Sequence, residues 1–256
     1  MTETWTKRES LAFASQHSSV SFAISVADGY TRWAPLYDDS PNPLLAREER
    51  YLLPLLGDVR KKKILDLACG TGRWLEKLAA HCPTSCAGID CSPAMLDVGR
   101  RKQLLAGKLA LGACECLPFA TGWFDLSICS FALGHFRNLE TIAAEAARVS
   151  HAGGDLFITD LHPLAYKQGW KVGFRDQQAT AIEIPVLAYG PSEIRAAFLS
   201  NGWELVRLDS LWMEQPEQVV FARAGRLDRF ASASQVPAIL ALHFRRPMDT
   251  PEIWET

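Results

Sequence analysis

The chain contains 256 residues, with 27 lysines and arginines against 29 aspartates and glutamates. Apolar residues make up 48% and charged residues 22%, values that exclude a disordered tail, a collagen-like repeat and a short disulfide-stapled scaffold. The formal net charge of -2 provides no basic field for a nucleic-acid backbone, so we expect no nucleic-acid partner.

The sequence lacks membrane and targeting signals. No apolar run approaches the roughly 18 residues that indicate a transmembrane helix, and residues 1–7 lack the basic-then-apolar pattern of a signal peptide. The cysteine count of 7 is odd, and most cysteines lie in apolar runs. Free thiols are typical of a reducing compartment, so we predict a cytoplasmic protein without a membrane partner.

A strand–helix alternation dominates the chain from residue 62 onward. After an expected helix at 44–56, apolar runs predict strands at 63–67, 86–90, 108–112, 124–129 and 155–159. Helical patterns occupy 73–80, a segment from 93, and 138–149, where the helix stops at Gly153 and Gly154. Strands that alternate with helices indicate βαβ units and a mostly parallel sheet.

Two segments fall outside this alternation. Residues 1–43 form an N-terminal cap segment, and 163–190 contain two β-like runs around Asp176 that predict a hairpin inserted after the fifth strand. After a helix capped by Ser192 we expect a strand at 203–212, a helix at 217–230 and a final strand at 237–244, which can lie antiparallel. We expect one domain over 1–256, with a variable lid.

Aromatic residues gather in both of these segments. Tyr30, Trp33 and Tyr37 recur at spacings of three and four, which fits either a helical core stripe or a cover over a cofactor. The insertion adds Trp170, Phe174 and Tyr189. These three either line a substrate pocket or form the packing face of the hairpin. Because residues 1–43 otherwise contain little regular core, we expect them to be mobile without cofactor and ordered with it.

The most informative stretch runs from Ile64 to Trp74. A strand enters a loop of small residues that contains Gly70 and Gly72 and passes directly into a helix. Glycines let a ligand approach the backbone, and the start of a helix offers unpaired N–H groups. Asp90, twenty residues beyond Gly70, ends the next strand, where a carboxylate can bind ribose hydroxyls. This geometry predicts a nucleotide-type ligand.

The loop departs from the dinucleotide fingerprint. The three glycine positions of that fingerprint read Ala68, Gly70 and Arg73, which disfavours an NAD-dependent reductase. Asp66 at the loop entrance suits a ligand with positive charge and an amino-acid end. The alternatives are that Asp66 only caps the following helix and that Asp90 is an ordinary surface carboxylate.

Four segments resemble, in order, motifs of the class I S-adenosylmethionine-dependent methyltransferases, in the type-11 group that includes ubiquinone and menaquinone biosynthesis enzymes. They are LDLACGTG at 65–72, GIDCSPAML at 88–96, CECLPF at 114–119 with WFDL at 123–126, and RVSHAGG at 148–154. The resemblance covers residues 30–162. It implies a Rossmann-like α/β fold, a three-layer sandwich around a seven-stranded, mostly parallel sheet whose last strand is antiparallel.

The resemblance also implies a function, which is methyl transfer from S-adenosylmethionine to a small-molecule acceptor with S-adenosylhomocysteine as product. Gly70 and Gly72 would pass under the methionine part, Asp66 would support its amino group, and Asp90 would hold the ribose. The other implied cofactor-binding residues are Trp33, Tyr37, Ala68, Cys91, Met95, Cys114, Glu115, Ser130 and Phe131. The family usually carries an acid at the position of Ala113, so adenine recognition here leans on Glu115, water or backbone.

Two histidines are candidate catalytic bases. A base is needed only for a hydroxyl or carbon-acid acceptor. His135 lies beyond the fourth strand and His162 beyond the fifth, where ligands bind in open α/β sheets. The alternative for each is a structural polar contact. A catalytically silent module that binds the cofactor or its product is the alternative function, favoured by Ala113 and by the lack of an obvious catalytic signature.

The cysteines raise a last alternative, a metal site or other thiol chemistry. The residues concerned are Cys82, Cys86, Cys91, Cys114 and Cys116. Zinc sites pair two ligand doublets at defined spacing, and the Cys82–Cys86 doublet has no matching partner. We therefore expect buried structural thiols and no metal.

Overall fold

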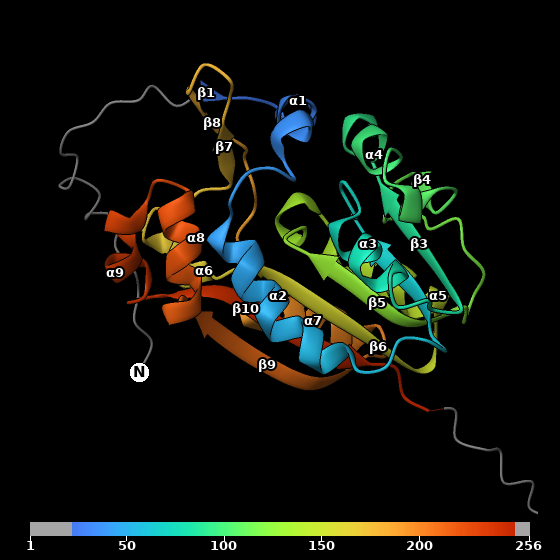
Figure 1. Ribbon diagram of the computed structural model, residues 1–256. Coiled ribbons are helices and arrows are strands. Elements are labelled where there is room, and N and C mark those ends of the chain that lie inside the picture. Colours follow the sequence, from blue (N-terminus) through green and yellow to red (C-terminus); the bar gives the residue numbers. More distant parts are fainter. Residues whose placement is uncertain (1–21, 249–256) are drawn as a thin grey trace, which may run out of the picture.

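A seven-stranded sheet forms the centre of the protein in the computed structural model, which describes residues 22–248 (Figure 1). The strands are β2 (Lys63–Leu67), β3 (Ser85–Asp90), β4 (Leu109–Leu111), β5 (Phe124–Ser130), β6 (Ser150–Leu161), β9 (Glu204–Trp212) and β10 (Pro237–Arg245). Their order is β4-β3-β2-β5-β6-β10-β9. Strands β2 to β6 are mutually parallel, and β10 is antiparallel to β6 and β9. The predicted sheet and its antiparallel last strand are confirmed.

Helices cover both faces of this sheet, whereas α1 (Val26–Trp33) packs against the smaller sheet described below. The others are α2 (Pro43–Leu56), α3 (Arg73–Ala79), α4 (Pro93–Gly99), α5 (Leu139–Val149), α6 (Pro163–Lys167), α7 (Pro191–Ser200), α8 (Gln218–Arg223) and α9 (Phe230–Ala233). Alternate residues of β2 point to opposite faces, so Ile64 packs with α2 and α3, whereas Leu65 and Leu67 pack with α5 and α7. Within residues 22–248, no helix combines the length and hydrophobicity needed to cross a membrane.

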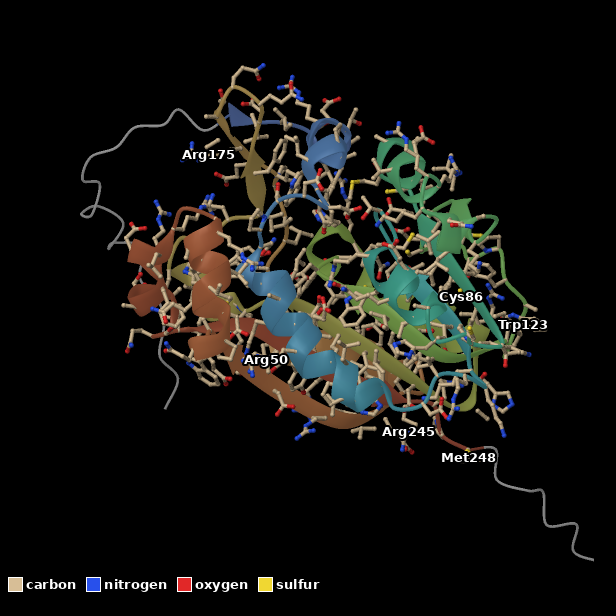
Figure 2. All side chains as sticks on the ribbon, in the orientation of Figure 1. Arg50, Cys86, Trp123, Arg175, Arg245 and Met248 are labelled. Carbon is tan, nitrogen blue, oxygen red and sulfur yellow. The ribbon has the colours of Figure 1, made fainter. Side chains whose placement is uncertain are left out.

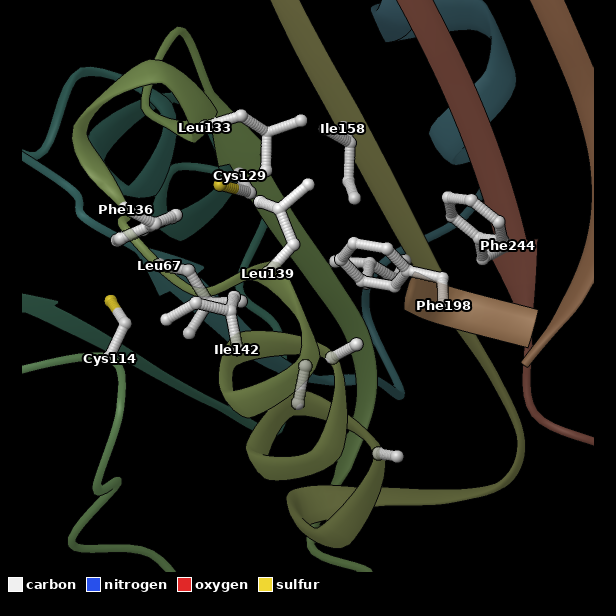
Figure 3. Packing of buried hydrophobic residues seen from close by; sticks show 14 of the residues in the cluster. Leu67, Cys114, Cys129, Leu133, Phe136, Leu139, Ile142, Ile158, Phe198 and Phe244 are labelled. Carbon is white, nitrogen blue, oxygen red and sulfur yellow. The ribbon is translucent and has the colours of Figure 1, made fainter. Parts of the chain in front are cut away.

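The core on the α5 and α7 side is continuous with the last strand. Figure 3 shows Leu67 of β2 beside Leu139 and Ile142 of α5, with Phe198 of α7 against Phe244 of β10. The two phenylalanine rings stack with their centroids 4.8 Å apart. This packing holds the central strands so that their carboxyl ends form one edge.

A second, small sheet lies above that edge (Figure 1). Strands β7 (Gly173–Arg175) and β8 (Ala181–Glu183) form the predicted antiparallel hairpin, and β1 (Phe22–Ala23) pairs with β8. Figure 2 shows Arg175 on this hairpin, with Cys86 and Trp123 toward the opposite end of the main sheet. The N-terminal segment and the insertion therefore meet, although they are far apart in sequence.

The structure corrects three sequence-based expectations. The helix expected at 217–230 is broken into α8, α9 and two 3-10 turns, because Gly225 takes a left-handed φ of 65°. Helix α5 ends at Val149 and β6 begins with the next residue, so the strand is longer than the expected 155–159. Gly153, with a φ of 79°, accommodates an irregularity in the pairing of β6 with β5. The cap of α7 is Gly190, not Ser192, because Pro191 starts the helix.

The N-terminal segment also contains more regular core than its sequence indicates. Residues 26–33 form α1 and Ala34–Leu36 a 3-10 turn, and Trp33 and Ala34 are buried, with 9% and 2% of their surface exposed. Residues 1–21, which belong to the predicted cap segment, lie outside the described residues.

Candidate active site

The glycine loop connects β2 to α3 at the carboxyl edge of the sheet. Its backbone takes left-handed φ values of 52° at Ala68, 56° at Gly70 and 73° at Gly72. The Gly72 N–H donates to the carbonyl of Cys69 over 2.8 Å, and α3 follows directly. A Cβ at residue 72 would lie 2.5 Å from Leu105 Cδ1. Both the φ value and the contact require glycine there.

Asp90 ends β3 beside this loop. Its Oδ2 accepts a hydrogen bond from the Gly70 N–H and its Oδ1 one from the Ser92 N–H, each over 2.7 Å. The residue is 9% exposed, and burial raises its pKa above the ordinary value while the backbone donors oppose that shift. Asp90 is therefore no ordinary surface carboxylate, because it ties the end of β3 to the glycine loop.

Asp66 lies under the loop and is 3% exposed. Its Oδ2 accepts a hydrogen bond from the Leu75 N–H of α3 over 3.2 Å, so the expected helix-capping contact exists. Its Oδ1 accepts no hydrogen bond from the described part of the chain. Burial raises the pKa of Asp66 to about 7, opposed by the charge of Arg73. A cationic ligand would favour the ionised carboxylate.

The residues expected around adenine divide into buried and exposed ones. Met95 is buried, and its Cε lies 3.1 Å from where a Cβ at Gly70 would be. Burial raises the pKa of the Cys114 thiol to about 12, opposed by a backbone hydrogen bond from Ala68. Cys91, Ala113 and Glu115 are exposed. No contact in the structure tests their roles, which stay predictions.

A buried carboxylate that the sequence analysis did not single out, Glu48 of α2, lies at the same edge. It is 0% exposed. Its Oε2 forms a salt bridge with Arg73 and accepts from the Trp74 indole N–H over 3.1 Å. Its Oε1 accepts from the Ser130 hydroxyl over 2.7 Å and from the Thr159 hydroxyl. One carboxylate thus joins α2 and α3 to the ends of β5 and β6.

The sequence contained a weak signal for Glu48. It precedes Leu52 by four residues and Leu56 by eight, which places it on the buried stripe of an amphipathic helix. Ser130, expected at the methionine end of the cofactor, also accepts a hydrogen bond from Arg73 Nη2 over 3.0 Å. Arg73 Nη1 is buried and has no partner within residues 22–248.

The aromatic residues of α1 pack against the hairpin. The Trp33 ring stacks on Phe174 with centroids 5.1 Å apart and meets Tyr37 edge-on at 4.9 Å. Tyr30 stacks on Trp33 at 5.8 Å. The core-stripe interpretation therefore holds for α1, and the packing interpretation holds for Phe174. The same aromatic group lies above the sheet edge, so cofactor contact by Trp33 and Tyr37 stays a prediction.

The other aromatic residues of the insertion also pack inward. The Tyr189 hydroxyl donates to the Phe136 carbonyl over 2.6 Å, and Trp170 is partly buried against the cluster around α8 and β10. Phe131, expected near the methionine end, takes a left-handed φ of 51°. Its N–H donates to the Thr159 carbonyl over 2.8 Å. Phe131 therefore marks a sharp turn where β5 leaves the sheet.

His135 ends a 3-10 turn, Leu133–His135, that follows β5. Its Nε2 lies 2.8 Å from the Tyr30 hydroxyl, and the two rings meet edge to face at 5.3 Å. Its Nδ1 is buried and without a partner in the described chain. Burial lowers the pKa of His135 to about 4, so the ring is neutral near pH 7 and is a weaker base than an ordinary histidine. Its predicted catalytic role is not tested by these contacts.

His162 has partners for both ring nitrogens. It is the N-cap of α6, where Nδ1 accepts from the Leu164 N–H over 3.1 Å. Because Nδ1 accepts, the ring proton is on Nε2, which lies 3.2 Å from the Ser210 hydroxyl. Burial lowers the pKa of His162. These contacts favour the alternative of a structural histidine over the expected catalytic one.

Asp160, at the end of β6, lies near His135 without having been singled out. Its Oδ2 accepts from the Gly134 N–H over 3.0 Å and its Oδ1 from the Leu161 N–H over 2.7 Å. Burial raises the pKa of Asp160 to about 6. The Tyr166 hydroxyl of α6 is buried with no partner among the described residues, and burial together with the charge of Asp160 raises its pKa.

The cysteines are all free thiols. Cys86 and Cys114 are buried as expected, but Cys82, Cys91 and Cys116 are exposed, so the expectation of buried thiols is wrong for these three. Among the residues that the structure describes, no group of three or more histidine, cysteine, aspartate or glutamate side chains is arranged to hold a metal ion.

A cavity of about 700 Å³ lies on the outer side of the glycine loop, between the 3-10 turn after α1 and helices α2 and α3. Tyr37 and Arg73 form part of its wall. The Lys102 ammonium is already paired with Asp38 at 2.8 Å and with Glu76 at 3.1 Å. The cavity therefore offers no unpaired ammonium at Lys102, and it shares Tyr37 and Arg73 with the candidate site.

The sheet edge fits an S-adenosyl ligand by the chemistry of its groups. Asp90 provides an acceptor for ribose hydroxyls, and the free oxygen of Asp66 suits an ammonium. The unpartnered Nη1 of Arg73 suits a carboxylate. Buried polar atoms in native proteins are almost always paired by protein, water or ligand, so the orphaned donor points to a bound group.

Comparisons with known proteins match the segment that contains the glycine loop and Asp90. Residues 64–154 match the family model described as "Methyltransferase domain". A malonyl-[acyl-carrier protein] O-methyltransferase of Legionella pneumophila is 33% identical over 145 residues, 56% of this chain and 49% of that protein. A demethylmenaquinone methyltransferase of Thermotoga maritima is 33% identical over 115 residues, 44% of this chain and 49% of that protein. The chain thus spans about half the length of these curated relatives.

Solved structures share the fold. An S-adenosylmethionine-dependent methyltransferase from Mesorhizobium loti aligns with a TM-score of 0.63 at 17% identity and covers 79% of this chain and 100% of its own. Geranyl diphosphate C-methyltransferase from Streptomyces coelicolor aligns with a TM-score of 0.57 at 15% identity, covering 79% of each chain. The resemblance to S-adenosylmethionine-dependent methyltransferases drawn from the sequence motifs is confirmed for residues 64–154.

Proposed function

We propose that this protein binds S-adenosylmethionine at the carboxyl ends of β2 and β3 and transfers its methyl group to a small-molecule acceptor held beyond β5 and β6. The observation that carries the proposal is the 2.7 Å bond between the Asp90 carboxylate and the Gly70 N–H. It makes the ribose-binding acid and the glycine loop one rigid unit. Two geranyl diphosphate methyltransferase structures that share this fold, one solved with S-adenosylhomocysteine and one with sinefungin, support the choice of cofactor.

Each end of the cofactor is assigned to a different side chain. Asp90 binds the ribose, the free oxygen of Asp66 binds the ammonium, and Arg73 Nη1 binds the carboxylate. Met95 packs against adenine. Glu48 balances the charge of Arg73, to which it is bonded, so the cofactor carboxylate meets one free guanidinium nitrogen rather than an unpaired cation.

The bound cofactor supplies a methyl group that its sulfonium already makes electrophilic. The protein therefore has to align the acceptor and exclude water. Trp33, Tyr37 and Phe174 form the aromatic roof over the sheet edge, and His135 and Asp160 lie where the acceptor binds. Orientation of this kind can supply as much as ~7–11 kcal/mol of a barrier. We assign residues 22–43 and the insertion 163–190 to a closing lid of a single domain.

Calorimetry with S-adenosylhomocysteine tests the proposal. A hydrogen bond to a charged group is worth ~1.5–3 kcal/mol, so Asp90→Ala weakens binding by about ten- to a hundredfold. Asp90→Asn keeps one acceptor oxygen and gives a smaller loss. Asp97→Ala on α4 is the matched control, because Asp97 is exposed and its one salt bridge within residues 22–248 is with Arg100. No binding by the wild type, or equal binding by Asp90→Ala and Asp97→Ala, contradicts the proposal.

A second assay tests whether the protein catalyses methyl transfer or only binds the cofactor. Release of S-adenosylhomocysteine from S-adenosylmethionine is followed with a panel of phenol, amine and carboxylate acceptors. Turnover with any of these acceptors supports a methyltransferase. It argues against the alternative of a catalytically silent binding module, which is the function that Ala113 favours. The free thiols of Cys82, Cys91 and Cys116, all exposed, support a cytoplasmic location for this activity.

A further inference from the structure

The Tyr30–His135 pair is the part of the site that the proposed function leaves unexplained. Tyr30 lies on α1 and His135 follows β5, 105 residues away, and their side chains meet at 2.8 Å. Within the described residues, the Tyr30 hydroxyl makes this one hydrogen bond and His135 Nδ1 makes none. A neutral imidazole carries one proton, which lies on either Nδ1 or Nε2.

The two tautomers leave different atoms unpaired. With the proton on Nδ1, the Tyr30 O–H donates to Nε2, and only the Nδ1–H lacks a partner within the described residues. With the proton on Nε2, the ring donates to the tyrosine oxygen, and both the Tyr30 proton and the Nδ1 lone pair lack partners. Each tautomer leaves one donor unpaired, but the form with the proton on Nε2 also leaves an unpaired acceptor. Because unpaired buried polar atoms are costly, the contacts favour the tautomer with the proton on Nδ1, whose N–H is free for a ligand.

The surrounding groups keep this pair neutral. Burial raises the pKa of the Tyr30 phenol well above the ordinary value, and the charges of Tyr37, Asp90, Asp160 and Tyr166 add to this shift. Tyr30 therefore keeps its proton for donation. Burial lowers the pKa of His135 to about 4, so its ring does not gain a second proton near neutral pH.

We infer that Tyr30 is a positioning residue that holds His135 in the Nδ1–H tautomer, so that His135 donates a hydrogen bond to an oxygen of the methyl acceptor instead of removing its proton. The inference rests on the proposed function for the identity of the acceptor site, which lies beyond the carboxyl ends of β5 and β6. It limits the acceptor to compounds with a hydrogen-bond-accepting oxygen near the methylated atom.

The tautomer is measured directly by nitrogen NMR on protein labelled with ¹⁵N-histidine, without any ligand. The His135 signals are those that His135→Asn removes. We expect a protonated Nδ1 and an unprotonated Nε2 in the wild type at pH 7, and a change toward the Nε2–H form in Tyr30→Phe. Tyr189→Phe is the matched control, because it removes a hydroxyl bonded to the carbonyl of Phe136 and leaves the His135 ring contacts intact.

Two NMR results would overturn the inference. One is an Nε2–H tautomer of His135 in the wild type. This result does not depend on whether any variant folds. The other is the same tautomer in wild type and Tyr30→Phe. If S-adenosylhomocysteine fails to bind while the Nδ1–H tautomer is found, the proposed function fails and the positioning role of Tyr30 stands.

A turnover comparison tests the donor role on whichever panel acceptor is methylated. The side-chain amide of His135→Asn places an N–H near the position of Nδ1, whereas His135→Gln places it near Nε2. We expect His135→Asn to retain turnover within about tenfold and His135→Gln to lose more. Loss of a general base costs about a hundredfold or more, so equally large losses in both variants would show that proton removal is the role of His135.

Discussion

Glu48 offers the sharpest test of how the site is held together. The variant Glu48→Ala removes the acceptor of four side chains from three elements at the carboxyl edge, which are Arg73, Trp74, Ser130 and Thr159. Arg73 is left as a largely buried cation without its counter-charge. The variant Glu48→Gln keeps the volume and one oxygen acceptor but also removes the negative charge.

The expected loss of stability follows from burial. Removing one partner of a buried ion pair costs about 3–5 kcal/mol. For a domain of this size each kcal/mol lowers the melting temperature by about 2–4 °C, so Glu48→Ala should melt roughly 6–20 °C below the wild type. The melting temperature of Glu48→Gln should lie between those of the wild type and Glu48→Ala. Because Arg73 follows the glycine loop, both variants should also weaken binding of S-adenosylhomocysteine.

Thermal unfolding followed by circular dichroism gives the comparison, with Glu49→Ala as the control. Glu49 is the next residue on α2 and forms a half-exposed pair with Lys77 at 3.0 Å, an interaction worth about 0–1 kcal/mol. The melting temperature of Glu49→Ala should fall by a few degrees at most. If Glu48→Ala unfolds no earlier than Glu49→Ala, the buried network does not hold the sheet edge.

Three further outcomes are expected. Gly72→Ala should lower the melting temperature more than Gly57→Ala, because both positions have a left-handed φ but a Cβ only at residue 72 meets a neighbour, 2.5 Å away; equal shifts would contradict this. Trp33→Ala and Phe174→Ala should be non-additive in unfolding free energy by about 0.5–1.5 kcal/mol, as stacked rings are; a double-mutant cycle without coupling would show independent packing. S-adenosylhomocysteine should slow proteolytic cleavage between residues 22 and 43, and cleavage unaffected by the ligand would argue against a lid.

The parts of the fold that could be predicted are those determined by neighbouring residues in the sequence. Each central strand is a short apolar run, and the loop with Gly70 and Gly72 is a continuous motif whose φ values only glycine adopts easily. The errors arose where one residue type supports two structures. Glycine at 153 suggested the end of a helix, whereas the chain had already entered β6.

The parts of the site that could not be predicted depend on tertiary contacts. The spacing of α2 marks Glu48 as facing inward, but only the fold brings Ser130 and Thr159 to its carboxylate. The Tyr30–His135 contact joins residues 105 positions apart. For His162, sequence position correctly indicated the carboxyl edge but not the Leu164 and Ser210 contacts that occupy its ring. Strand ends give the location of a site, and only packing gives the role of each side chain.

The two interpretations of Asp66 differ in their proton linkage. Burial raises the pKa of its carboxyl from 3.8 to about 7 in the free protein. A raised pKa means that the folded state retains the proton, so its stabilising contribution is present below pH 3.8 and is lost as pH rises through about 7. If Asp66 binds the cofactor ammonium, the complex favours the ionised form and binding expels the proton.

Affinity for S-adenosylhomocysteine should therefore rise with pH up to about 7, by at most about tenfold per unit, and level off above it. Calorimetry at pH 6 in two buffers with different ionisation enthalpies measures the protons released. We expect close to one for the wild type and nearly none for Asp66→Asn, with Asp160→Asn as the control for the other acid that titrates near pH 6. Proton release that persists in Asp66→Asn would mean that Asp66 serves α3 alone, through its bond to the Leu75 N–H, and that another group meets the amino-acid end of the ligand.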